Sequence, residues 1–420
     1  MESLDAVDGG EVRSVLSSIV EYASTPGEEA AVVAWFRDRL EEWGFETVTW
    51  EADANVLAEH PSFPDDPAAI DVADRPSVGG VLEFGDPDAG RTLVLNGHVD
   101  VVPASEGSWS SPPFEATWNG DELTARGAAD MKGGVVAAAF AARAAAERAR
   151  DRGLDGRLVV EAVAGEEEGG IGAASAALDS PYDFERDACI VAEPTELDCI
   201  TAVEGSLMGE IRLEGRSAHA ATRWRGESAI EHFERVHEAL RAFERERDET
   251  ITHPLYDEFP IRWPVNVGTV RAGEWASSVP AALEAGVRVG VAPGETVDEV
   301  EGAVRERLRA VADADAWTRD NPPVFEREGI QFEPAAVDVD EPVVDAVRDA
   351  MTSAGLDDEP HGATYGADSR HYVAAGIPTV VFGPGSIDQA HFPDETVDVT
   401  EVREAAAVIA DAAVGFLDGE

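Results

Sequence analysis

The chain contains the stretch Thr92-Leu-Val-Leu-Asn-Gly-His98-Val-Asp100-Val-Val-Pro103, in which an apolar run with strand propensity ends at Asn-Gly. His98 and Asp100 follow two residues apart, and in an extended segment such residues share a face. A metal-bound imidazole usually needs its second nitrogen held by a carboxylate or a carbonyl. The pattern therefore indicates His98 as a metal ligand and Asp100 as its orienter, although an ordinary polar strand end can look the same.

Two further segments place carboxylates beside glycines. In Ala125-Arg-Gly-Ala-Ala-Asp130-Met-Lys-Gly-Gly134, Asp130 precedes an alanine-rich stretch that favours a buried helix. A strand-like run from Leu158 ends in Gly165-Glu166-Glu167-Glu168-Gly-Gly170. Without a functional site, Asp130 would simply complement the dipole of the following helix, and the three glutamates would simply be solvated. The glycines permit tight backbone approach, which favours a site.

The same pattern of an apolar strand followed by a ligand-type residue occurs twice more. Ala188-Cys-Ile-Val-Ala ends at Glu193, and Pro378-Thr-Val-Val-Phe-Gly-Pro-Gly-Ser386 leads to His391. In α/β sheets, ligands bind at the carboxyl ends of strands, where loops supply the chemistry. The joint occurrence of these segments predicts a two-metal hydrolytic site.

Taken together, these segments resemble the M20 metallopeptidase family, from about residue 10 to the C-terminus. That family includes acetylornithine deacetylases, succinyl-diaminopimelate desuccinylases, aminoacylases and carboxypeptidases, and the chain is most similar to the first two groups. The resemblance implies an α/β fold with a zinc-peptidase-like catalytic domain, in which helices flank a mixed central sheet. A smaller α+β lid or dimerisation domain would be inserted at 204–317, so that residues 1–203 and 318–420 form the catalytic domain.

The resemblance also implies a ligand set for two divalent ions, zinc before cobalt or manganese. Asp130 would bridge the ions, with His98 and Glu193 on one ion and Glu167 and His391 on the other. A bridging hydroxide would attack an amide bond, with Glu166 as general base. The family has two adjacent glutamates where this chain has three, and the downstream Gly-Gly-x-Gly favours Glu166 and Glu167 over Glu167 and Glu168. Without cations, so many clustered carboxylates would repel one another.

Further residues are assigned through the same resemblance. In Gly-Arg-Ser-Ala-His219, the histidine would steady the tetrahedral oxyanion, in its own subunit or in that of a partner. Arg288 and Asn266 match positions that contact substrate, and Gly383 and Gly385 are assigned to substrate binding as well. The expected molecule is therefore a homodimer that acts on a small acyl amino acid or a short peptide.

Composition narrows the partners and the environment. The chain has 420 residues, 44% of them hydrophobic, which is ample for two domains. It carries 85 acidic and 32 basic residues, a net charge of −53, and Lys132 is its only lysine. Such a surface disfavours nucleic acid or an anionic membrane as a partner and is typical of a halophilic, salt-accumulating cytoplasm. Lys132 itself, in the Asp130 turn, is expected to have a structural role.

Other classes of function fit the sequence less well. Two cysteines exclude a disulfide framework, and the longest apolar stretch, 133–142, is too short to span a bilayer, which favours a soluble, cytoplasmic protein. A serine hydrolase would use Ser217 with His219, but no Gly-x-Ser-x-Gly elbow is present. A non-catalytic metal- or amino-acid-binding relative is the third class. Within the favoured class, a deacylase of amino-acid metabolism, a dipeptidase and a carboxypeptidase remain open.

Overall fold

The computed structural model describes residues 7–419, which form two compact units. The larger unit consists of 7–202, 336–361 and 367–419, and the smaller unit consists of 203–335 and 362–366. The smaller unit thus extends beyond the boundary expected at 317, because strand β12 (Val324–Arg327) pairs with β9 of its sheet. The predicted fold class, a mixed sheet flanked by helices plus a smaller α+β domain, is confirmed.

The central sheet of the larger unit has nine strands within the described residues, in the order β1-β2-β6-β3-β7-β15-β8-β13 with β14 beside β8. The strands are β1 (Glu46–Trp50), β2 (Ser77–Phe84), β3 (Arg91–His98), β6 (Gly156–Val163), β7 (Ala188–Val191), β8 (Cys199–Val203), β13 (Ala335–Ala336), β14 (Pro360–Ala363) and β15 (Thr379–Val381). β3 runs parallel to both β6 and β7, and Leu95 lies between Val160 and Ile190. The carboxyl ends of these three strands therefore share one edge of the sheet.

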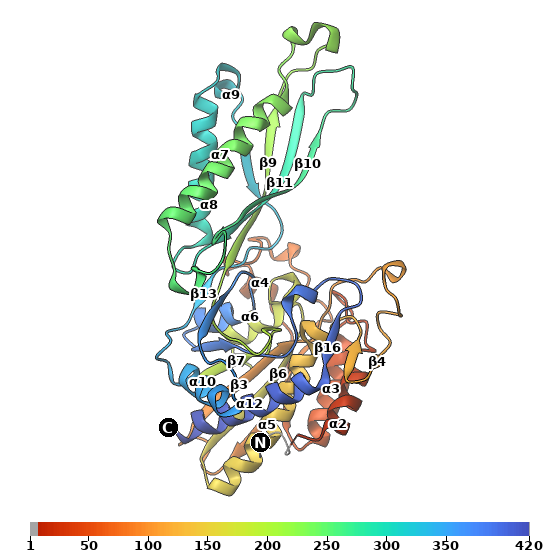
Figure 1. Cartoon of the computed structure of the whole chain (residues 1–420), viewed down its shortest axis with the longest axis vertical. Helices are drawn as coiled ribbons and strands as arrows, with labels where there is room; N and C mark the ends of the chain where they lie inside the picture. Colours follow the sequence, from red (N-terminus) through yellow and green to blue (C-terminus); the bar gives the residue numbers. More distant parts are fainter. Residues whose placement is uncertain (1–6, 420) are drawn as a thin grey trace. The chain divides into compact units, whose positions relative to one another are not determined.

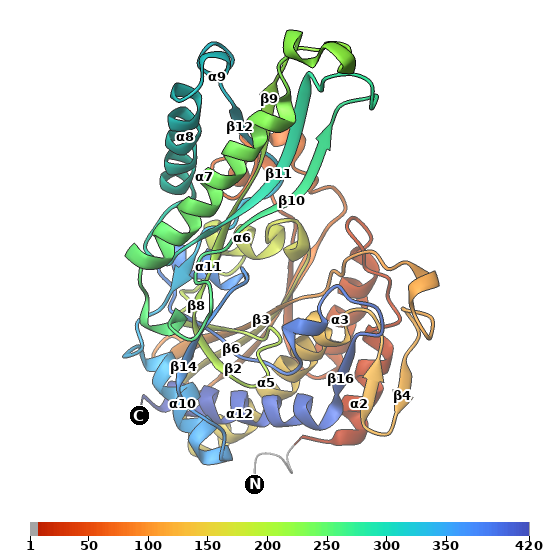
Figure 2. The same cartoon turned by 45° about the horizontal axis from the view of Figure 1, so that its top comes forward.

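Helices cover both faces of this sheet (Figure 2). On one face, Gly97 of β3 lies so close to Val135 that a Cβ would clash, and this places α5 against the strand. On the other face, Asn96 Nδ2 donates to the Tyr372 hydroxyl at 3.0 Å, from α11. The principal helices are α2 (Gly9–Ile19), α3 (Ala30–Glu42), α5 (Gly133–Arg152), α6 (Ile171–Leu178), α10 (Pro342–Ala354), α11 (Ser369–Ala374) and α12 (Val399–Asp418), with a short α4 (Ala54–Leu57).

A small antiparallel sheet lies beside the Asp130 turn. It has the order β16-β5-β4, with β4 (Thr117–Asn119), β5 (Glu122–Thr124) and β16 (Thr396–Asp398). The register pairs Thr396 with Thr124, and Ala125 N donates to Glu395 O at 3.1 Å. This pairing holds two segments far apart in sequence next to each other, one leading into Asp130 and the other following His391.

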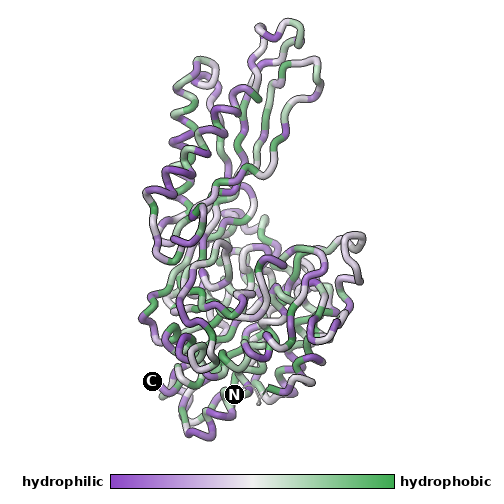
Figure 3. Tube along the Cα trace, in the orientation of Figure 1, coloured by the Kyte–Doolittle hydropathy of each residue, from purple (hydrophilic) through white to green (hydrophobic). Residues whose placement is uncertain are grey.

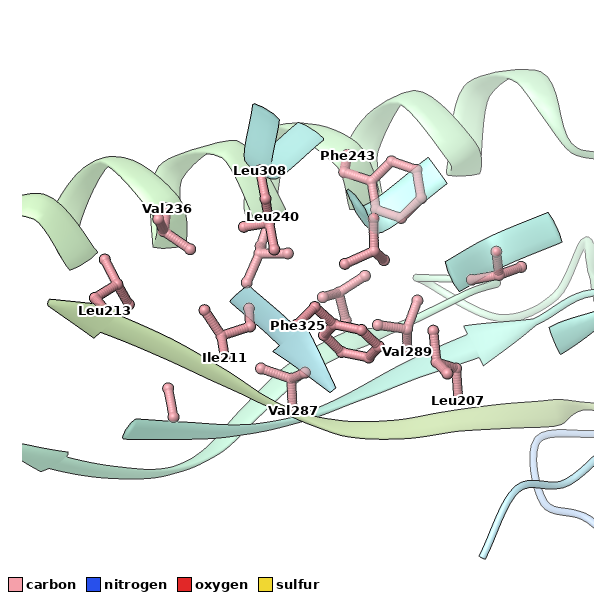
Figure 4. Packing of buried hydrophobic residues seen from close by; sticks show 14 of the residues in the cluster. Leu207, Ile211, Leu213, Val236, Leu240, Phe243, Val287, Val289, Leu308 and Phe325 are labelled. Carbon is pink, nitrogen blue, oxygen red and sulfur yellow. The ribbon is translucent and has the colours of Figure 1, made fainter. Parts of the chain in front are cut away.

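The smaller unit is a four-stranded antiparallel sheet covered on one face by two helices (Figure 1). Its strands follow the order β10-β11-β9-β12, with β9 (Gly205–Glu214), β10 (Val265–Ala272) and β11 (Ala282–Val291), and its helices are α7 (Ala229–Thr250), α8 (Val297–Asp313) and the short α9 (Ala316–Asp320). Val236, Leu240 and Phe243 recur at helical spacing along α7 and pack onto the sheet (Figure 4). Thr296 and Glu299 form a capping box that starts α8.

Hydrophilic residues are frequent along the two long helices of the smaller unit (Figure 3). Figure 3 shows hydrophilic residues in purple along much of α7 and α8, interrupted by the apolar positions that face the sheet. Among residues 7–419, no helix combines the length and the apolar character that a membrane crossing requires.

Candidate metal centre

Parallel strands bring the predicted site residues of the larger unit to one edge of the central sheet. β3 ends at His98, β7 is followed by Glu193, and β6 leads through Gly165 into the short turn η4 (Glu166–Glu168). Asp130 lies in a tight turn, η3 (Ala128–Lys132), immediately before α5. Carboxyl ends of parallel strands are where α/β proteins build their sites, so the topology itself gathers these side chains.

The first group that could hold a metal ion consists of His98, Asp130 and Glu193, all buried. His98 Nε2 lies 3.0 Å from Asp130 Oδ1 and 4.0 Å from Glu193 Oε2. One ligand atom from each residue lies within 4.8 Å of the others. Two carboxylates and one imidazole in a closed space match the donor set that zinc prefers in catalytic sites.

The second group consists of Asp130, Glu167 and His391. His391 Nε2 lies 3.1 Å from Glu167 Oε2 and 3.6 Å from Asp130 Oδ2. Asp130 therefore belongs to both groups, with Oδ1 toward His98 and Oδ2 toward His391. An aspartate with one oxygen facing each group is the arrangement that a ligand shared by two ions requires.

The three adjacent glutamates point to different partners. Glu167 faces His391, whereas Glu168 accepts a hydrogen bond from Arg75 Nη1, and Arg75 also pairs with the buried Glu29. Glu166 is buried but belongs to neither metal-binding group. The turn thus offers one carboxylate to the second group, ties one to an arginine and leaves Glu166 beside the groups.

Asp100 has a different arrangement from the expected one. His98 Nδ1 donates to the backbone carbonyl of Asp100 at 3.0 Å, while the nearest carboxylate oxygen of Asp100 is 3.7 Å away. The carboxylate instead accepts backbone N–H groups of Gly165 at 2.8 Å, Glu166 at 3.2 Å and Glu167 at 3.1 Å. Asp100 therefore orients the imidazole through its main chain and holds the glutamate turn through its side chain.

The electrostatics of the cluster fit bound cations. Burial raises the pKa of Glu193 well above its usual value, and the negative charges of Asp130, Asp368 and Glu167 add to this rise. Burial and the charge of Asp368 likewise raise the pKa of Glu166, and burial raises that of Glu167. So many buried carboxylates lack sufficient positive charge from the protein, and divalent cations would supply it.

The structure adds three site residues that the sequence analysis missed: Arg126, Asp368 and Glu395. Asp368 precedes α11, is fully buried, and neither of its carboxylate oxygens has a hydrogen-bond partner among the described residues. Arg126 and Glu395 form a buried ion pair with 2.7 Å between Nη1 and Oε2. The available signal for Glu395 was its place four residues after His391, and in a chain with 85 acids such a position stands out little.

Lys132 is completely buried, and its ammonium group donates to the backbone carbonyl of Tyr22 at 2.7 Å. It thus ties the segment after α2 to the turn that carries Asp130. This contact gives the only lysine of the chain a structural place beside the metal-binding groups.

Two glycines assigned to substrate binding have visible structural partners. Gly383 N donates to Thr195 Oγ1 at 3.1 Å, and a Cβ at this position would collide with the carbonyl oxygens of Ala192 and Glu193. Gly385 has a φ of 91°, and its N–H donates to Glu401 at 3.0 Å. Both glycines let the chain pass close to the Glu193 segment, and contact with substrate stays a prediction for each.

The remaining predicted residues lie in the smaller unit. Asn266 and Arg288 are direct cross-strand partners on β10 and β11, so their side chains share one face of the sheet. Arg288 Nη1 donates at 3.2 Å to Glu204, a fully buried carboxylate whose pKa burial raises to about 7. His219 is exposed, and its Nδ1 accepts the backbone N–H of Ala221 at 3.0 Å.

Sequence comparison matches residues 94–414 to the peptidase family M20/M25/M40. The chain belongs to this family. Enzymes of the family typically bind two metal ions, and the two residue groups that share Asp130 lie within the matched range. The chain is accordingly a metal-dependent hydrolase of amide bonds.

Two relatives resemble the chain over most of its length. Both are N-formyl-4-amino-5-aminomethyl-2-methylpyrimidine deformylases. The protein from Halalkalibacterium halodurans is 29% identical over 347 residues, which cover 78% of this chain and 79% of the relative. The protein from Bacillus subtilis is 26% identical over 428 residues, which cover 96% and 93%.

Solved structures share the fold at lower identity. A tripeptidase from Staphylococcus aureus superposes with a TM-score of 0.73 at 15% identity, covering 98% of this chain and 99% of the other. An M20 metallo-carboxypeptidase from Sulfolobus solfataricus gives a TM-score of 0.72 at 16% identity, with coverage of 97% and 99%. Human carnosine dipeptidase 1 gives 0.70 at 15% identity, with coverage of 99% and 98%. Within the M20 family, these likenesses establish the architecture.

Proposed function

We propose that the chain hydrolyses the amide bond of N-acyl amino acids or short peptides, with Glu166 as general base. The observation that carries this proposal is the pair of metal-binding groups sharing Asp130, with the buried Glu166 beside them and part of neither. A binding protein would need the ligands only. A buried carboxylate next to the ligands, held by its own backbone hydrogen bond to Asp100, is the feature that hydrolysis requires.

The residues that would hold the ions are His98, Asp130 and Glu193 for one ion and Asp130, Glu167 and His391 for the other. Zinc suits these imidazole and carboxylate ligands best, and cobalt or manganese would suit them too. When bound, two such ions lower the pKa of a water molecule and polarise the carbonyl of the scissile amide. Because Glu168 is engaged by Arg75, this register is better supported than one in which Glu168 is a ligand.

A few side chains of the protein would take part in the reaction or position the groups that do. Glu166 accepts a proton from the attacking water and returns it to the nitrogen of the leaving amine, which prevents expulsion of an unstable amide anion. Asp100 keeps the turn of Glu166 in place through its backbone hydrogen bonds. Arg288 and Asn266, side by side on β11 and β10, would contact the carboxylate of the substrate or the oxyanion.

Three acyl groups are candidates for the substrate. The motifs are most similar to those of acetylornithine deacetylases and succinyl-diaminopimelate desuccinylases, which would imply acetyl or succinyl groups. The two relatives, which are named as deformylases of an N-formyl aminomethylpyrimidine, add the formyl group. All three acyl groups pose the same chemical task at the carbonyl and differ in the space they need beside it.

A substrate panel tests this function. We expect turnover of at least one member among N-formyl, N-acetyl and N-succinyl amino acids, the N-formyl aminomethylpyrimidine and dipeptides, measured in high KCl with added zinc, cobalt or manganese. Removal of metal by a chelator should abolish that turnover, and re-addition should restore it. A rate that survives chelation would favour a serine hydrolase, and failure on every amide would favour a non-catalytic binding protein. Preference for peptides would identify a dipeptidase or carboxypeptidase.

We also propose that the active form is a homodimer in which His219 acts on the catalytic centre of the partner subunit, to steady the oxyanion. Two observations support an interface on the smaller unit. β10 is an outer strand of its sheet, with pairing on one side only among the described residues. Large apolar side chains are exposed nearby, including Val270 at 50%, Trp275 at 71% and Trp224 at 75%.

Subunit complementation tests this arrangement. His219→Ala and Glu166→Gln should each be nearly inactive alone. After mixing and subunit exchange, activity should return to roughly a quarter of wild type, because half of the dimers are mixed and each mixed dimer has one intact site. Sedimentation of the same samples would establish the dimer. A dimer without recovery would place His219 in its own subunit's site.

A further inference from the structure

Glu395 is a buried carboxylate that accepts hydrogen bonds from the backbone of the Asp130 turn. Its Oε1 accepts the N–H groups of Ala129 at 2.9 Å and Asp130 at 3.0 Å. Its Oε2 accepts the N–H of Gly127 at 3.0 Å and the guanidinium of Arg126 at 2.7 Å. The side chain of Glu395 is fully buried. Four donors converge on one carboxylate, and three of them belong to the main chain of the turn itself.

The other member of the pair reaches the second half of the metal centre. Arg126 Nη2 donates to the backbone carbonyl of His391 at 3.3 Å. His391 has a left-handed backbone with a φ of 66°, and its side chain is 56% exposed, so little packing holds it. The Arg126 guanidinium carbon lies over the Trp109 ring, 5.1 Å from the ring centroid, and this contact helps to hold the Arg126 side chain.

The two metal-binding groups depend on this pair to different degrees. His98 and Glu193 lie at the ends of the buried strands β3 and β7, whose ladders position them without any help from Glu395. In the second group, Asp130 depends on Glu395, and His391 depends on Arg126. The first group therefore has one ligand positioned by the pair, and the second group has two.

We infer that Arg126 and Glu395 are positioning residues for the metal centre, and that they chiefly maintain the affinity of the ion held by Asp130, Glu167 and His391. The inference rests on the two-ion centre of the proposed function and goes beyond it by separating the two ions. A carboxylate that accepts three main-chain N–H groups fixes the direction in which the Asp130 side chain leaves the turn. Partners of ligands commonly contribute about 10–100-fold to metal affinity.

Metal titration of two variants tests this inference. Glu395→Gln keeps the shape but loses the charge and an acceptor oxygen, and Arg126→Lys keeps the charge but loses the second donor to His391. Metal-free protein would be titrated with zinc chloride by calorimetry in high KCl, and the bound metal counted by mass spectrometry. We expect the first ion to bind within a few-fold of wild type in both variants and the second to bind about 10–100-fold more weakly.

Glu244→Gln is the matched control. Glu244 is also a buried carboxylate that accepts a backbone N–H, from Val265 at 2.7 Å, and pairs with Arg241, but it belongs to the smaller unit. This variant should bind both ions as wild type does. The melting temperature of each metal-free protein would show how far the fold itself is affected.

Each outcome has a distinct meaning. Two ions bound with wild-type affinity in both variants would overturn the inference. So would equal weakening of both ions together with a fall in the metal-free melting temperature greater than that of the control, because this pattern indicates a general structural role. A wild-type chain that takes up fewer than two ions would instead overturn the two-ion centre itself.

Discussion

Glu166→Gln should lower kcat by about 10²- to 10⁴-fold, the range typical of a lost general base, while both metal ions remain bound. The physical reason is that Glu166 belongs to neither metal-binding group, so its loss removes a proton acceptor and no ligand. Glutamine preserves the size of the buried side chain. Turnover on the best substrate of the panel and metal content by mass spectrometry would be measured on the same sample.

The neighbouring glutamates provide the controls for this experiment. Glu167→Gln should weaken the second ion, because Glu167 lies against His391 and Asp130. Glu168→Gln should retain metal and most of the turnover, because Glu168 pairs with Arg75 and is 39% exposed. If Glu168→Gln lost metal while Glu167→Gln kept metal and lost turnover, the general base and ligand would each move one residue along the chain. Full activity in Glu166→Gln would overturn its assignment as the base.

Dilution from about 2 M to about 0.1 M KCl should lower the melting temperature by more than about 5 °C, which for a chain of this size is roughly 4 kcal/mol, and should inactivate the enzyme. With a net charge of −53, the acidic side chains repel one another. The distance over which salt screens this repulsion grows from roughly 3 Å at about 1 M salt to about 10 Å at 0.1 M. Differential scanning fluorimetry and activity across a KCl series measure both effects. A melting temperature that does not change with KCl would contradict the proposed adaptation to a salt-rich cytoplasm.

Two controls separate charge screening from general salt effects. Sucrose stabilises proteins by exclusion from the surface and screens no charge, so it should replace KCl only in part. Glu46→Lys with Glu147→Lys changes the net charge from −53 to −49 by substituting exposed acids that form no ion pair among the described residues. This double variant should depend less steeply on KCl than wild type.

Much of the metal centre could be predicted because short sequence motifs mark its ligands. His98 ends an apolar run, and Glu193 follows another, so each is marked by its own strand. The structure brings His98, Asp130, Glu167, Glu193 and His391 together in the two expected sets. The predicted family and fold class are confirmed. They could be predicted because a series of strand-ending motifs in this order carries far more information than each motif alone.

The partners of those ligands could not be predicted in the same way. Glu395 acts on Asp130 although more than two hundred residues separate them in the sequence, and the pairing of β16 with β5 helps to bring their segments together. The side chain of Asp100 turned out to serve the glutamate turn, and a carbonyl orients His98. Hydrogen bonds between distant segments leave no periodic pattern in the chain.

The stretch from Thr92 to Pro103 separates the features that followed from the sequence alone from those that depended on the tertiary structure. Its apolar run and the His-x-Asp that follows were sufficient to predict a strand with a metal ligand at its end, because strand propensity and side-chain alternation are properties of neighbouring residues. Three properties depended on the packed molecule: Asp130 directs one carboxylate oxygen toward each ligand group, Arg75 engages Glu168 while Glu166 stays outside both groups, and Glu395 holds the Asp130 turn. Those properties arise when strands, turns and loops from opposite ends of the chain meet in a buried space, where each carboxylate must find a hydrogen bond or a cation.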